Sequence, residues 1–103
     1  MEPSQSAGPM PLPQGTQVVS ASGRGLVLRS PEAVTKGTIL EFEVLLGARP
    51  LQVMARVVEA RAEPGGHSLH TEFVAMAQVD RDSLIDFLTA VGPESLRVRR
   101  TQA

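Results

Sequence analysis

The residues best suited to chemistry lie in one short stretch, Ser20-Ala-Ser-Gly-Arg-Gly25, between the apolar runs Val18-Val19 and Leu26-Val-Leu28. Glycine adopts backbone angles that other residues resist, and serine hydroxyls bond nearby backbone groups in turns. The stretch therefore predicts a tight connection between two strands, in which successive N–H groups can form a concave anion site. The alternative is an ordinary hairpin turn without a ligand, which Gly/Ser composition favours on its own.

Arg24 and Arg29 are the first cationic side chains of the chain, because no Arg or Lys precedes Arg24 in the sequence. A guanidinium group can hold a phosphate or a carboxylate through two hydrogen bonds, and arginine is well suited to protein interfaces. We therefore consider both arginines candidates for contact with a protein partner. The alternative for each is a solvated surface charge.

Catalytic and metal-binding chemistry has little support in the sequence. The two histidines, His67 and His70, are three residues apart on a predicted strand and so face opposite sides of it. The chain has no cysteine, which removes disulfides, thiol catalysis and cysteine-bound zinc. Nothing places a histidine to activate a serine, and no Gly-Lys-Ser/Thr phosphate loop is present. We expect no enzyme activity, no cofactor and no metal site.

Composition narrows the possible partners. The 103 residues suffice for one domain with a modest core. A net charge of −1, with no Trp or Tyr and three Phe, argues against nucleic-acid binding. No apolar run approaches the roughly 18 residues that span a bilayer, so membrane insertion is not expected. Without a signal peptide at the N-terminus, the chain is predicted to be cytoplasmic.

Hydrophobic periodicity predicts several antiparallel strands followed by one helix. Strands are expected over residues 16–20, 25–29, 38–46, 51–61 and 68–73. The clearest alternation places Leu40, Phe42, Val44 and Leu46 on one strand face. After residue 76 the period changes, and the apolar positions of one helix face are Leu84, Phe87, Leu88 and Val91. Asp80 is a candidate N-cap, and Gly92-Pro93 should end the helix.

The termini are predicted to be tails. Residues 1–15 hold four prolines, which favour extended and unpaired chain, so a disordered proline-rich tail is expected there. Residues 93–103 are expected to form a polar C-terminal tail that contains three arginines. Residues 16–92 then form the folded domain. Because a small sheet must close on itself or be covered, an all-β fold with a small antiparallel barrel and a C-terminal amphipathic helix satisfies the pattern.

The sequence resembles the PilZ domain family from about Val18 to Ala90. Ser20-x-Ser22-x-x-Gly25 is similar to the family's signature of Asp or Asn, any residue, Ser, two further residues and Gly. Leu-Val-Leu-Arg-Ser-Pro-Glu follows it, and Lys36-Gly37-Thr38 then precedes the alternating strand, as in the family. The resemblance implies a PilZ-like β-barrel with a C-terminal helix. It also implies ligand-binding positions at Ser20, Ser22 and Gly25.

The resemblance has two departures that bear on function. Ser20 stands where the family has Asp or Asn, and the family's upstream Arg-x-x-x-Arg signature is absent. Members that bind cyclic di-GMP use those arginines and the second signature for the nucleotide. Members without the motif act as adaptors in pilus or motility control. We therefore expect a bacterial adaptor that contacts a protein partner, without cyclic di-GMP. The alternative is a cyclic di-GMP receptor with a reduced site.

Overall fold

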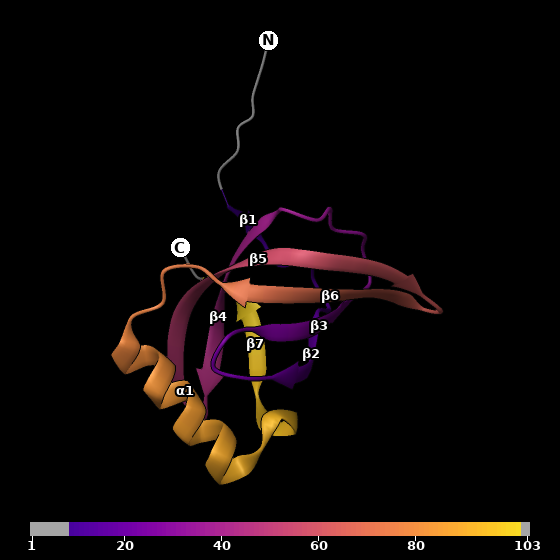
Figure 1. Ribbon diagram of the computed structural model, residues 1–103. Coiled ribbons are helices and arrows are strands. Elements are labelled where there is room, and N and C mark those ends of the chain that lie inside the picture. The colour runs from indigo at the N-terminus through magenta and orange to yellow at the C-terminus, as the bar shows by residue number, and fades with distance from the viewer. Residues whose placement is uncertain (1–8, 102–103) are drawn as a thin grey trace.

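Seven strands and one α-helix dominate residues 9–101, the part of the chain that the computed structural model describes (Figure 1). The strands are β1 (Met10–Pro11), β2 (Gln17–Ala21), β3 (Leu26–Ser30), β4 (Ile39–Leu46), β5 (Arg49–Glu63), β6 (Gly66–Phe73) and β7 (Arg97–Arg100). The helix α1 (Gln78–Val91) and the short 3-10 helix η1 (Pro93–Ser95) lie between β6 and β7. Within this part of the chain no helix is long and apolar enough to cross a membrane.

All seven strands belong to one sheet, in the order β1-β4-β5-β6-β3-β2, with β7 also paired to β4. The predicted β-rich fold with a helix near the C-terminus is confirmed. The sheet does not close as a barrel, because among residues 9–101 no ladder joins β2 to β7. A hollow of about 370 Å³, lined by residues of β2, η1 and β7, lies along this open seam.

The hairpin of β4 and β5 supplies the centre of the core. Phe42 pairs with Val53 and Val44 pairs with Leu51, and all four side chains are buried. Glu41 and Glu43 alternate with these residues and stay partly exposed, as the period of two requires. The alternation predicted for residues 38–46 is therefore confirmed.

Each of the two terminal segments that were expected to be tails contains a short strand, β1 at the N-terminal end and β7 at the C-terminal end. Met10 and Pro11 pair in parallel with β4, and the next residue, Leu12, is 2% exposed. The expectation that the prolines keep this segment unpaired is wrong for residues 10–12, because Leu12 is buried in the core and a two-residue strand needs few N–H donors. The remainder of that predicted tail, residues 1–8, lies outside the described residues.

The C-terminal arginines alternate with an apolar residue that the sheet uses. Val98 pairs with Val44 and packs against the core, while Arg99 forms an ion pair of 2.6 Å with Glu43. Arg100 Nε donates to the carbonyl oxygen of Leu12 at 2.7 Å and so links β7 to the segment that follows β1. The segment expected to be a polar tail is thus a strand over Arg97–Arg100, because β4 has an edge free to pair with it.

Helix α1 lies across one end of the curved sheet (Figure 1). Leu84 is its fully buried side chain, whereas Phe87 and Leu88 are half-buried and Val91 is 46% exposed. The expected N-cap is wrong: Ala77 occupies that position and makes no side-chain cap. Gly92, with φ of 87°, ends the helix as predicted, and its N–H donates to Leu88 O at 2.9 Å.

Leu84→Ala is expected to lower the free energy of unfolding by about 2–5 kcal/mol, because truncating a fully buried leucine leaves a cavity. The matched control Leu88→Ala, half-buried on the same helix, should cost about 1 kcal/mol. Urea unfolding followed by circular dichroism measures both. Equal losses for the two variants would show that α1 is not anchored through Leu84.

Candidate functional site

The turn between β2 and β3 is held by its own hydrogen bonds. Ser22 N–H donates to the carbonyl oxygen of Gly25 at 3.0 Å, and Arg24 N–H donates to Ser22 Oγ at 3.2 Å. The ladder of the two strands shifts register between Val18 and Ser20, where a bulge redirects the chain. The predicted strand–turn–strand connection is confirmed, with the Ser22 hydroxyl accepting from the turn's own backbone.

Next to this turn lies an open hollow of about 370 Å³. The three residues of the signature, Ser20, Ser22 and Gly25, all line it, and so does Arg24. Residues of β5 and β6 also line it, among them His70 and Glu72. The structure thus gathers four of the five predicted site residues around one hollow.

The charges of the hollow nearly cancel. Arg24 is exposed and forms no ion pair with another residue of the described range 9–101. Arg24 is the one arginine or lysine that lines the hollow within that range, and Glu72 lines the same hollow. A bound anion would meet both charges, so the hollow has a weaker attraction for phosphate than a pair of arginines would give.

Close packing explains the glycines of the turn. A Cβ atom on Gly25 would overlap the carbonyl oxygen of Thr71 in β6 and lie 2.8 Å from the carbonyl carbon. A Cβ atom on Gly23 would lie 2.8 Å from Ile85 Cδ1 of helix α1, and Arg81 Nη1 donates to Gly23 O. The turn is therefore packed between β6 and α1, and backbone must approach backbone at Gly25.

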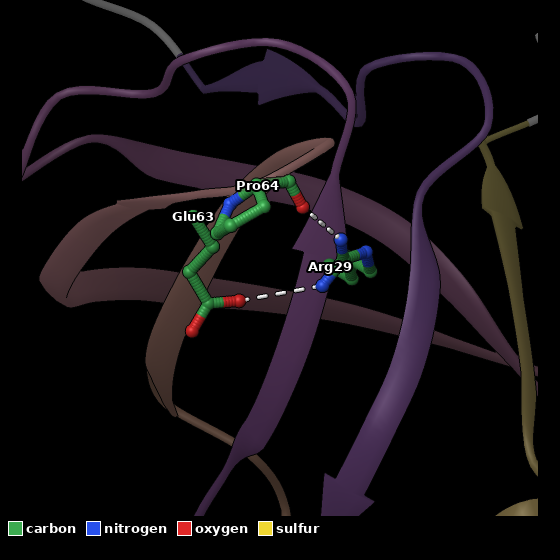
Figure 2. Close-up of polar contacts among 3 residues, drawn as sticks. All are labelled: Arg29, Glu63 and Pro64. Carbon is green, nitrogen blue, oxygen red and sulfur yellow. Dashed lines mark hydrogen bonds and ion pairs between the residues drawn. The ribbon is translucent and has the colours of Figure 1, made fainter.

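The fifth predicted residue, Arg29, lies away from the hollow, at the tip of the hairpin of β5 and β6 (Figure 2). Its Nη1 is 3.3 Å from Glu63 Oε1, and its Nη2 donates to the carbonyl oxygen of Pro64 at 2.7 Å. The Arg29 side chain is 43% exposed, so such a pair contributes at most about 1 kcal/mol. Arg29 thus has partners within the chain, and its role at a protein interface remains a prediction.

The two histidines take different positions on β6. His70 is exposed and lines the hollow, whereas His67 pairs with Ser30 and Ala62 and is half-buried. Within residues 9–101 no group of three or more side chains is arranged to hold a metal ion.

Thr71 and Arg81 position the site and were missed by sequence reasoning. Thr71 Oγ1 donates to Leu26 O at 2.9 Å and accepts from Leu26 N–H at 3.3 Å, which ties β3 to β6 beside the turn. The one sequence feature that points to Thr71 is the alternation along the strand, which places Thr71 on the same face as Leu69 and Phe73. Its partner is 45 residues away, and Arg81 is 58 residues from Gly23, so periodicity cannot connect them.

A protein-family model described as PilZ domain matches residues 4–90 of the chain. The match covers more than half of the 103 residues. The chain belongs to the PilZ domain family. No curated protein and no solved structure matches it. The family match covers the β2–β3 turn and every residue that lines the hollow beside it, which we call the signature hollow.

Gly25→Ala is expected to lower the free energy of unfolding by about 1–3 kcal/mol or more, because the added methyl group meets backbone that cannot rotate away. Gly23→Ala is the matched control in the same turn. Its methyl group meets the flexible end of Ile85, so we expect a smaller loss. Thermal and urea unfolding measure both, and a Gly25→Ala variant as stable as the wild type would contradict the packing argument.

Proposed function

We propose that this PilZ protein is a non-enzymatic bacterial regulatory adaptor that acts by protein–protein interaction in the cytoplasm, in motility or pilus control, without binding cyclic di-GMP. The observation that carries the proposal is the charge balance of the signature hollow, where Arg24 is offset by Glu72. Cyclic di-GMP has two phosphates and two guanines, so its recognition needs several charge-assisted hydrogen bonds. The hollow has few groups that can make them.

Two sequence features support the absence of nucleotide binding. No Arg or Lys stands before Arg24, so the described segment that leads into β2 brings no cation to the hollow. Ser20 has one hydroxyl where the PilZ signature has Asp or Asn, and it cannot accept from two N–H groups of a guanine edge as a carboxylate can. Each lost charge-assisted bond is worth roughly 1.5–3 kcal/mol, so losing two weakens binding by orders of magnitude.

The exposed position of Arg24 supports a protein contact at the hollow. Its backbone is fixed on both sides, since its N–H donates to Ser22 Oγ and its carbonyl oxygen accepts from Phe73 N–H at 2.9 Å. The guanidinium group is left exposed on a rigid turn. Because the backbone of the turn is already ordered, binding through Arg24 has to order only its side chain, which favours its use as an interface anchor.

Isothermal titration calorimetry with cyclic di-GMP is expected to give no dissociation constant below about 100 µM, because few charge-assisted contacts remain. Ser20→Asp is the matched control. It restores the first signature position but adds no cation, so it should not create micromolar binding. A micromolar constant for the wild type would favour a cyclic di-GMP receptor with a reduced site and overturn the adaptor proposal.

Arg24→Ala is expected to change the free energy of unfolding by less than about 0.5 kcal/mol, because the side chain is exposed. The same variant should weaken motility or pilus function in cells that carry it. Arg61→Ala changes an exposed arginine that does not line the hollow, and it is the matched control that should leave function unchanged. Equal melting temperatures together with equal activity of Arg24→Ala and wild type would remove Arg24 from the interface.

A further inference from the structure

A separate cavity of about 220 Å³ lies between β4, β5 and the first turn of α1. Its apolar lining includes Met54, Val74, Ala75 and Met76, and its carboxylates are those of Glu41 and Asp80. We call it the methionine cavity. None of its lining residues belongs to the signature hollow, so the two are distinct sites.

The backbone that forms the methionine cavity is fixed on one side and strained on the other. Val74 N–H donates to the carbonyl oxygen of Met54 at 2.8 Å and extends the sheet beyond the end of β6. Ala75 then turns the chain toward α1 with φ of 56°, a left-handed conformation that costs energy for a residue with a Cβ atom. The side chains of Met54 and Met76 are flexible and polarizable, and such walls adapt to the shape of an incoming group.

Within the part of the chain that the structure describes, the two carboxylates of the methionine cavity have no cationic partner. Neither Glu41 nor Asp80 forms an ion pair within residues 9–101, and no basic residue lines the cavity there. Gln52 Nε2 donates to Glu41 Oε2 at 3.4 Å, a long contact. Arg81, the cation next to Asp80 in the sequence, donates to Gly23 O. The two carboxylates thus come from different elements, β4 and α1, and neither is paired with a cation among residues 9–101.

We infer that the methionine cavity receives an arginine side chain of a partner protein. The aliphatic stem of arginine fits against the methionine walls, and its guanidinium group has five N–H donors to share between two carboxylates. A neutral apolar side chain would desolvate the carboxylates without compensation, and an anion would be repelled. A lysine ammonium is more strongly hydrated and lacks the planar fork. This inference rests on the proposed adaptor function, and it specifies arginine as the side chain through which the partner protein binds.

The NMR signals of the methionine methyl groups can report binding in the cavity. The protein has four of them, and only Met54 and Met76 line the cavity within the described residues. Titration of the methyl-13C-methionine protein with N-acetyl-arginine amide is expected to shift the methyl signals of Met54 and Met76 and to leave Met10 unchanged. The dissociation constant should be of millimolar order for one side chain. N-acetyl-norleucine amide, which lacks the charge, should bind at least about fivefold more weakly.

A double variant, Glu41→Gln with Asp80→Asn, is expected to weaken binding of N-acetyl-arginine amide at least about fivefold while the methyl spectrum stays dispersed. Asp86→Asn, which removes an exposed carboxylate of the same helix outside the cavity, is the matched control and should leave binding unchanged. No shift at Met54 and Met76, or equal binding of the norleucine compound, would overturn the inference. These readouts use neither cyclic di-GMP nor a cellular phenotype, so this inference and the adaptor proposal fail separately.

Discussion

The close approach of the β2–β3 turn to β6 is the contact on which the functional surface depends. Gly25 lies against the carbonyl group of Thr71 with no room for a side chain. Beside it, the Thr71 hydroxyl bonds both polar backbone groups of Leu26. Together they fix where β3 begins relative to β6. The position of Arg24 at the hollow follows from this contact, since Phe73 N–H holds the Arg24 carbonyl oxygen.

The same turn is also covered by helix α1 at Gly23, so the turn has a structural role whether or not a ligand is bound. Ile85 packs on Gly23 and Arg81 donates to its carbonyl oxygen. Leu84, between these two contacts in the sequence, is the side chain that anchors the helix in the core. A change at the turn therefore acts directly on α1. The first turn of the helix lines the methionine cavity through Asp80, and Arg81 and Ile85 of the same helix contact the turn beside the signature hollow.

The open seam of the sheet shows how the chain's ends complete the fold. On β4, β1 pairs with residues 40–41 and β7 pairs with residues 42–45, so two short strands share the edge of one long strand. The bond from Arg100 to Leu12 joins them. β7 pairs with β4 along one edge, and within residues 9–101 no ladder joins its other edge to β2, so the sheet curves without closing.

The sequence alone determined the elements whose residues repeat with a regular period. The β4–β5 hairpin, the existence and C-terminal end of α1 and the turn at Ser20–Gly25 were all predictable, because alternation, the helical period and Gly/Ser turns are local signals. Only the tertiary structure decided which of those elements meet. The burial of Leu12 and Val98 depends on free positions along β4. The pairing of Thr71 with Leu26 and of Arg81 with Gly23 depends on contacts across 45 and 58 residues. No local pattern encodes such distances, and so the terminal strands, the open seam and the methionine cavity required the folded chain.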